Sequence, residues 1–280
     1  MEIKYSVLMS VYRNEEGRYL HDALESMAQQ TIIPSEIVLV EDGPLTEDLY
    51  RTIKTFDEEH PALLKTVINE KNLGLGLALQ KGILACSSEL IARMDSDDVS
   101  RRGRCEKQLH EFDKDPALSL CGGWIREFPE ENMEETTGIR EVPATDAEIR
   151  EYLKHRCPFN HMTVMYKKSE VLRAGNYQDY LYNEDYLLWI SMTLAGCRFH
   201  NLQEVLVDVR TSRDMYANRR GGDAYYQSEK GIQKKLLENH LITESVYNRN
   251  VAERFILQKM MTPGMRSFVF RHFARSGGDK

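Results

Sequence analysis

Residues 91–98 read IARMDSDD, an apolar segment that runs directly into three near-adjacent carboxylates, Asp95, Asp97 and Asp98. Like charges this close repel one another, and burial would raise their pKa values, so a divalent cation is the usual remedy. In an extended backbone, residues two apart point to the same side. We therefore expect Asp95 and Asp97 to share one ligand, while Asp98 turns away or starts a helix.

The oxygen-only character of this cluster predicts Mg2+ or Mn2+, ions that typically keep coordination sites for phosphate oxygens. The alternative is a helix N-terminus, because aspartate stabilises the positive end of a helix and Ser100 precedes a helical pattern. One carboxylate would suffice for a cap. Metal binding by Asp95, Asp97 and Asp98 is therefore the favoured interpretation.

The composition is that of an ordinary globular protein. With 280 residues, 41% of them hydrophobic, the chain can bury a full core. A formal net charge of -7 argues against a nucleic-acid partner, because such binding needs a basic face. Five dispersed cysteines without a C-x-x-C pair fit reduced thiols in the cytoplasm. Neither a signal peptide nor an apolar run of about 18 residues is found, so neither secretion nor a membrane span is predicted.

Strand and helix patterns alternate through the first third of the chain. Apolar strands are expected at 5–11, 37–40, 63–69 and 90–94, and helices at 18–30, 46–60 and 76–85. This alternation predicts an α/β fold whose parallel sheet has right-handed crossovers. Ligands bind beyond the carboxyl ends of such strands, where Asp42 and the Asp95 cluster both lie.

The pattern changes after Arg101. Helices are expected up to 113, at 146–155 and at 186–195, strands at 118–124 and 162–166, and a solvated acidic loop at 130–135. Beyond residue 221 the chain reads as largely helical.

Two segments before residue 85 are candidates for nucleotide binding. Asp42 ends the second strand, where its carboxylate can accept a hydrogen bond from a ring N-H or a ribose hydroxyl, or can simply start the turn at Gly43. Residues 72–82, NLGLGLALQKG, fail the dinucleotide fingerprint, because Leu79 stands where its third glycine belongs. We interpret them as a strand-to-helix loop whose backbone approaches a nucleotide.

Two later segments also contain candidate functional residues. His161 opens an apolar strand pattern, where a single histidine is more often a hydrogen-bonded structural residue than a ligand. Glu184 and Asp185 precede an apolar helical segment, so they either stabilise its N-terminus or supply a general base.

Taken together, five segments in sequence order resemble family 2 of the glycosyltransferases, which have the GT-A fold. They are SVLMSVYRNE (6–15), EDG (41–43), DSDD (95–98), NH (160–161) and NEDY (183–186). VEDGP (40–44) and residues 210–220 are most similar to the bacterial exopolysaccharide, capsule and lipopolysaccharide branch of amylovoran type.

The resemblance implies a Rossmann-like, mostly parallel sheet flanked by helices, with a helical C-terminal extension. A GT-A domain over 1–220 would divide into a nucleotide-binding part, about 1–100, and an acceptor part, about 101–220. Residues 221–280 would form the extension.

The resemblance also implies an inverting, metal-dependent hexosyltransferase. Its donor would be a nucleotide-diphosphate sugar, commonly a UDP-sugar, and its acceptor a hydroxyl of a glycan or lipid-linked saccharide in the cytoplasm. Asp185 would be the catalytic base, with Glu184 beside it, and Asp42 would bind the uracil or ribose. Asp95 and Asp97 would occupy the acid-x-acid motif, with Asp98 as an alternative metal ligand.

Asn160 and His161 would line the site near the diphosphate or the acceptor, and Glu41 stands where many relatives have aspartate. The implied substrate- and nucleotide-binding set is Val11, Tyr12, Glu41, Asp42, Asn72, Gly74, Lys81, Arg93, Asp95, His161 and Glu184.

Two rival functions remain open. A sugar-phosphate nucleotidyltransferase shares the sheet and the metal, but usually carries a glycine-rich loop after the first strand, where this chain has VYRN (11–14). A catalytically silent nucleotide-sugar-binding protein would not need both acid clusters.

The C-terminal tail is both basic and apolar. Its basic residues are Arg266, Arg271, His272 and Arg275, interspersed with Met265, Phe268, Val269, Phe270 and Phe273. Such a segment suits peripheral contact with an anionic inner membrane face, or a helix docked on the domain with arginine stems over apolar surface.

Overall fold

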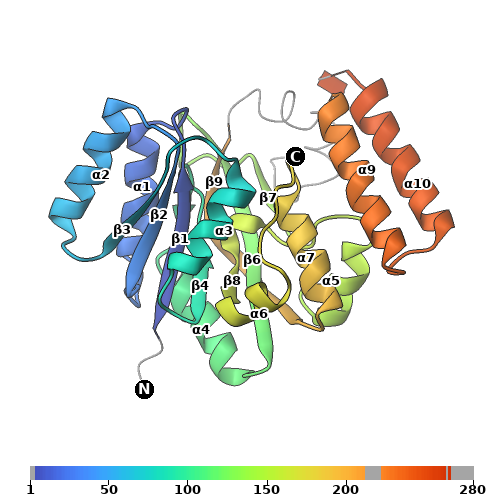
Figure 1. Ribbon diagram of the computed structural model, residues 1–280, viewed down its shortest axis with the longest axis horizontal. Coiled ribbons are helices and arrows are strands. Elements are labelled where there is room, and N and C mark those ends of the chain that lie inside the picture. The colour runs from blue at the N-terminus through green and yellow to red at the C-terminus, as the bar shows by residue number, and fades with distance from the viewer. Residues whose placement is uncertain (1–3, 212–221, 263, 266–280) are drawn as a thin grey trace.

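The computed structural model describes residues 4–211, 222–262 and 264–265. In this part of the chain, nine strands form one sheet in the order β3-β2-β1-β4-β8-β6-β9-β5, with β7 paired to β6. Figure 1 shows helices on both sides of the sheet, α1 and α2 near β3, and α9 beside α10 at the opposite end of the molecule. The α/β class expected from the sequence is confirmed.

The first half of the sheet follows the predicted alternation. Its strands are β1 (Tyr5–Val11), β2 (Glu36–Asp42), β3 (Leu64–Asn69) and β4 (Leu90–Arg93), joined by α1 (Gly17–Ala28), α2 (Glu47–Glu59) and α3 (Leu75–Ala85). The pairs β1–β2, β2–β3 and β1–β4 are all parallel. The carboxyl ends of these strands therefore meet at one edge of the sheet.

The second half of the sheet is mixed. Its strands are β5 (Val99–Ser100), β6 (Leu118–Pro129), β7 (Gly138–Arg140), β8 (Met165–Lys167) and β9 (Arg198–Thr211). β8 pairs antiparallel with β4 and β6, whereas β6 and β9 are parallel. The parallel character thus holds throughout β1–β4, and a mixture of antiparallel and parallel pairs extends the sheet beyond them.

Two details differ from the sequence expectation. No strand was expected at 198–211, yet β9 runs the length of β6 with register shifts near Gly123 and Trp124. Its polar residues mask the strand period, and its pairing partner lies about 80 residues earlier. His161 begins a short 3-10 turn, η1 (His161–Thr163), and the neighbouring strand starts only at Met165.

The remaining helices cover the two faces and one end of the sheet. They are α4 (Arg104–Lys114), α5 (Asp146–Leu153), α6 (Lys168–Arg173), α7 (Glu184–Leu194), α9 (Asp223–Glu238), α10 (Glu244–Phe255) and the π-turn η2 (Ile256–Met260). A capping box formed by Thr145 and Glu148 starts α5. Among the described residues, none of the helices combines the length and apolar character that a membrane crossing requires.

Alternating strand residues build two cores. Val7 and Met9 face the core shared with α1, α2 and α4, whereas Leu8 and Ile91 face the core shared with α3, α7 and α9. Arg93 lies two residues after Ile91, so its side chain projects toward the second core.

The helical nature of the C-terminal region is observed in α9 and α10. Ile232 and Leu236 of α9 lie in the same core cluster as Trp189 of α7. The boundary at 220/221 stays a prediction, because residues 212–221 lie outside the described part. Most of the 210–220 segment and the basic tail residues 266–280 lie outside it as well.

Gly82→Val is expected to destabilise the fold. A Cβ at Gly82 would lie 2.3 Å from Leu8 Cδ1 and 2.8 Å from Val40 Cγ2, so these buried side chains or α3 would have to shift. We expect a loss of about 1–3 kcal/mol in the free energy of unfolding, measured by urea titration. Gly103→Ala is the control, because the nearest atom to its Cβ would be 3.8 Å away. Equal losses in the two variants would contradict this account.

Candidate active site

The three aspartates of the DSDD segment lie together where β4 ends. β4 stops at Arg93, and residues 94–98 turn into β5. Asp95, Asp97 and Asp98 each offer a carboxylate oxygen, and these oxygens lie within 4.8 Å of one another. Asp98 therefore does not turn away, contrary to the expectation from an extended backbone. The turn after β4 brings consecutive residues to the same side.

The helix-cap alternative for this cluster is wrong. The helix that follows, α4, has Gly103 as its N-cap, without any side-chain cap. Ser100 lies in β5, and its backbone N-H donates to the Ser26 hydroxyl at 3.0 Å. None of the three aspartates is the N-cap residue of α4.

Arg210, near the end of β9, holds the cluster in place. Its backbone N-H donates to an Asp98 carboxylate oxygen at 3.0 Å, and its Nε donates to the Asp97 carbonyl oxygen at 3.2 Å. Its guanidinium lies 4.0 Å from the centre of the Tyr19 ring. Sequence reasoning missed this residue as a site component, because its contacts with Asp98 and Asp97 lie 112 and 113 positions earlier in the chain.

Asp98 is the most deeply buried member of the cluster, with a relative exposure of 2%. Burial raises the pKa of Asp98 well above its ordinary value, and the charges of Asp97 and Asp95 raise it further. The neighbouring loop contributes Glu15, which accepts a hydrogen bond from the Ser96 hydroxyl at 3.0 Å. Acidic side chains are therefore concentrated at this end of β4.

Asp42 organises the loop that leads into α3. Its carboxylate accepts bonds from Asn69 Nδ2 and the Leu73 N-H at 2.9 Å and from the Gly74 N-H at 3.0 Å. Lys81 Nζ donates to Asn69 Oδ1 at 2.7 Å, which extends this network. Asp42 thus does more than begin a turn: it holds the 69–74 segment against the end of β2.

The other predicted nucleotide-binding residues lie at the same strand ends. Glu41 is buried, and burial raises its pKa. The Val11 side chain belongs to the core, so only its backbone can meet a ligand, whereas Tyr12 is 38% exposed. Asn72 donates from Nδ2 to the Asp42 carbonyl oxygen at 3.3 Å. Gly74, with φ +87°, is the N-cap of α3.

Glu184 and Asp185 occupy the first turn of α7. The N-cap residue Asn183 makes no side-chain cap bond. Asp185 Oδ1 accepts from the Tyr186 N-H at 2.6 Å, and Asp185 Oδ2 accepts from Cys157 Sγ at 3.4 Å. Asp185 is half-buried and Glu184 is buried.

Both carboxyls of this pair hold their protons more tightly than free acids. Burial and the neighbouring Asp185 raise the pKa of Glu184 to about 7. Burial likewise raises the pKa of Asp185, against the Tyr186 N-H, Cys157 and the charges of Arg140 and Arg93, which lower it. Such displaced pKa values are typical of acid-base sites.

His161 and Asn160 are parts of the buried framework. His161 Nε2 lies 2.6 Å from the Tyr177 hydroxyl, and burial together with Arg93 lowers the pKa of His161 well below its ordinary value. The imidazole is therefore neutral near pH 7. Asn160 Nδ2 donates to the Gly123 carbonyl oxygen at 2.8 Å, which fixes η1 against β6.

A family model described as Glycosyl transferase family 2 matches residues 6–174. The chain belongs to this family. The UDP-Gal:alpha-D-GlcNAc-diphosphoundecaprenol beta-1,3-galactosyltransferase of Escherichia coli is 35% identical over 97% of both chains. The amylovoran biosynthesis glycosyltransferase AmsE of Erwinia amylovora is 39% identical over 80% of this chain and 82% of its own.

The fold of this family 2 glycosyltransferase is likewise shared with solved structures. TarS 1–349 of S. aureus, in complex with UDP-GlcNAc, superimposes with a TM-score of 0.62 at 18% identity, covering 96% of this chain and 75% of that one. This likeness confirms the GT-A fold. The resemblance to the amylovoran-type branch is also confirmed by the relatives.

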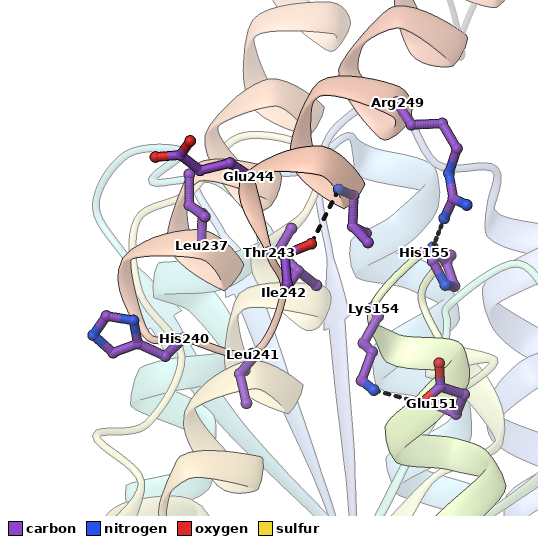
Figure 2. Close-up of a pocket in the computed structure, with 11 residues that line it drawn as sticks. Glu151, Lys154, His155, Leu237, His240, Leu241, Ile242, Thr243, Glu244 and Arg249 are labelled. Atoms are coloured by element: carbon purple, nitrogen blue, oxygen red, sulfur yellow. Dashed lines mark hydrogen bonds and ion pairs between the residues drawn. The ribbon is translucent and has the colours of Figure 1, made fainter.

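A separate pocket lies outside the candidate site of the glycosyltransferase. Figure 2 shows it between the end of α5 and the turn that joins α9 to α10. Two of its cationic side chains are already paired, Lys154 with Glu151 and Arg249 with His155. None of the residues that line it belongs to the predicted donor, metal or base sets.

Glu184→Gln is expected to change how stability depends on pH. The carboxyl has a pKa of about 7 in the folded protein and about 4.3 in an unfolded chain, so the folded state binds the extra proton between these values. The free energy of unfolding of the wild type therefore falls as pH rises through this window. The variant should match the wild type near pH 4.5 and exceed it by up to about 3 kcal/mol above pH 7.

Urea unfolding with chelator present, from pH 4.5 to 8, measures this difference. Asp179→Asn, at an exposed position before α7, is the control for the change from acid to amide. A constant difference between Glu184→Gln and wild type across this range would contradict a raised pKa at Glu184.

Proposed function

We propose that this protein is an inverting, metal-dependent hexosyltransferase. It moves a sugar from a UDP-sugar to a hydroxyl of a lipid-linked saccharide in bacterial surface-polysaccharide synthesis. The observation that carries the proposal is the three-carboxylate cluster of Asp95, Asp97 and Asp98, in a family 2 fold that also places two high-pKa carboxyls at the start of α7. The 35% identity to a UDP-Gal-dependent enzyme with a diphosphoundecaprenol-linked acceptor supports the donor and acceptor classes.

The two rival functions have less support. Family membership favours glycosyl transfer over nucleotidyl transfer. A silent binding protein would have no use for a base with a raised pKa beside the donor site.

The donor set of the cluster fits a divalent cation. Three carboxylates in reach of one point, one of them buried with its pKa raised by its neighbours, offer the hard oxygen ligands that Mg2+ and Mn2+ prefer. Asp97 and Asp98, with Asp95, would hold the ion. When bound, it would neutralise the charge that develops on the departing diphosphate oxygen.

Asp185 acts as the base in this proposal. An ionised, half-buried carboxylate can accept the acceptor hydroxyl proton while that oxygen attacks the anomeric carbon from the face opposite the leaving group. No covalent bond between enzyme and sugar is needed, so the configuration inverts. Glu184 is more buried than Asp185 and does not act as the base in this proposal.

The nucleotide is proposed to lie along the strand ends beside the cluster. Asp42 and the loop that it orders, with Asn72 and Gly74, would face the base and ribose. Tyr12 is exposed enough to contact the base. The proposed nucleotide site would be completed by Lys81, Glu41 and the backbone at Val11. His161 would lie on the acceptor side of the active site.

The transfer reaction is proposed to take place at the cytoplasmic face of the membrane. A diphosphoundecaprenol-linked acceptor in the 35% identical relative supports a membrane-bound substrate. Peripheral contact through the basic tail, residues 266–280, remains part of the proposal.

Asp185→Asn is expected to abolish transfer while preserving donor binding. The amide keeps the shape of the side chain but cannot take a proton, so kcat should fall by about 100-fold or more. The measurement is sugar transfer from UDP-galactose to a lipid-linked saccharide, with UDP binding followed by calorimetry. Asp179→Asn is the matched control. Undiminished turnover in Asp185→Asn would refute the assigned base.

Asp97→Asn is expected to weaken metal-dependent donor binding. Loss of one negative oxygen ligand lowers the affinity for Mn2+, and UDP affinity should fall about tenfold or more in the presence of Mn2+. Calorimetric titration with and without Mn2+ tests this. Asp57→Asn, an exposed carboxylate on α2, is the control. Unchanged Mn2+ affinity in Asp97→Asn would count against the metal site.

A further inference from the structure

The carboxylate of Asp185 is held by a hydrogen-bond donor on each of its two oxygens. Oδ1 accepts from the Tyr186 N-H at 2.6 Å, and Oδ2 accepts from Cys157 Sγ at 3.4 Å. Tyr186 follows Asp185 in α7, so the first bond forms within the helix. Cys157 belongs to the loop between α5 and η1, so the second bond joins Asp185 to a separate segment of the chain.

The loop that carries Cys157 is itself anchored on two sides. Arg140 of β7 donates from Nη2 to the Cys157 carbonyl oxygen at 2.9 Å. Arg254 of α10 donates from Nη2 to the His155 carbonyl oxygen at 2.6 Å. Neither bond involves the thiol. A substitution of the Cys157 side chain should therefore leave the loop in place.

The Cys157 thiol keeps its proton near pH 7. Burial raises the pKa of Cys157 well above its ordinary value, and the charge of Asp185 raises it further. The S-H group has one proton and two acceptors in reach, because Sγ also lies 3.5 Å from the Phe159 carbonyl oxygen. The carboxylate is the stronger acceptor of the two, because it is charged.

Packing is the alternative explanation for this side chain. Cys157 is partly buried and packs against the second core, whereas the other four cysteines are buried. A similar contact exists outside the candidate site. Cys197 Sγ donates to Glu170 Oε2 at 3.2 Å, just beyond the C-terminal end of α7. Cys197 therefore offers a matched comparison, a thiol bonded to a carboxylate that has no part in the proposed reaction.

Other titratable and charged groups act on Asp185 from α7, β7, β4 and the loop before α7. They are Glu184, Arg140, Arg93 and Tyr177. All of them stay in place when only Cys157 is substituted. A change in the titration of Asp185 in such a variant would therefore report the loss of the thiol.

We propose that Cys157 is a positioning residue for the base: its thiol fixes Oδ2 of Asp185 from the neighbouring loop, while Tyr186 fixes Oδ1 from within α7. This inference rests on the proposed glycosyl transfer, in which Asp185 takes the acceptor proton. A thiol is a weak donor, so it orients the carboxylate without removing its basicity. Each carboxylate oxygen keeps a further lone pair for that proton.

Cys157→Ala and Cys157→Ser separate positioning from packing. In Cys157→Ala, kcat near pH 7 should fall about threefold to tenfold with an unchanged KM for the UDP-sugar, because the base loses a donor but the donor site is intact. The acidic limb of the pH-rate profile should move to higher pH, because loss of this hydrogen bond raises the pKa of Asp185. Cys157→Ser keeps a donor and should restore most of kcat. Cys197→Ala is the control and should leave both kcat and the limb unchanged.

Infrared spectroscopy of the metal-free protein tests the contact without turnover. The S-H stretching band that disappears in Cys157→Ala, and persists in Cys197→Ala, belongs to Cys157. This band should move to higher frequency in Asp185→Asn, because an amide is a weaker acceptor than a carboxylate.

Three results would overturn the inference: an unshifted S-H band in Asp185→Asn, a loss of kcat in Cys157→Ala that is equal at every pH, or a Cys157→Ser variant as impaired as Cys157→Ala. Failure of the proposed function would look different. Wild type that is inactive with UDP-galactose, Mn2+ and a lipid-linked saccharide would contradict glycosyl transfer, and the infrared shift would still decide whether Cys157 holds Asp185.

Discussion

Excess negative charge at one edge of the sheet is the constraint on which the rest of the site depends. Asp95, Asp97 and Asp98 share a turn, and Glu184 and Asp185 begin the nearby helix α7. Carboxylates at such distances, partly removed from water, repel one another and shift their own pKa values upward. A fold can keep them only if cations and hydrogen-bond donors are brought to the same place.

The long second half of the sheet supplies part of that compensation. β9 runs beside β6 and pairs with the short strand β5, so Arg210 arrives next to Asp98 and Asp97. β8 pairs with β4, whose last residue, Arg93, forms a salt bridge with Asp95. In the proposed function, a divalent ion would neutralise the charge that remains on the three carboxylates.

The predictable and unpredictable parts of the structure differ in the range of their interactions. Strands β1, β2 and β4 were predicted because each is a short apolar run between helical patterns, and burial on both faces imposes that composition. β3, at the edge of the sheet, is largely exposed and was predicted from its place in the alternation. β9 was not, because polar residues such as Gln203 and Glu204 interrupt its period. The helix-start positions of Glu184 and Asp185 followed from local sequence, whereas the contact of Asp185 with Cys157 did not.

By itself the sequence determined the α/β class, the family and the acid motifs, because these depend on short segments whose residue types carry their own chemistry. Only the tertiary structure decided that Asp98 faces its two neighbours and that Arg210 contacts Asp97 and Asp98. These arrangements join residues as many as 113 positions apart. Such contacts arise from chain topology and packing, so local sequence patterns do not predict them.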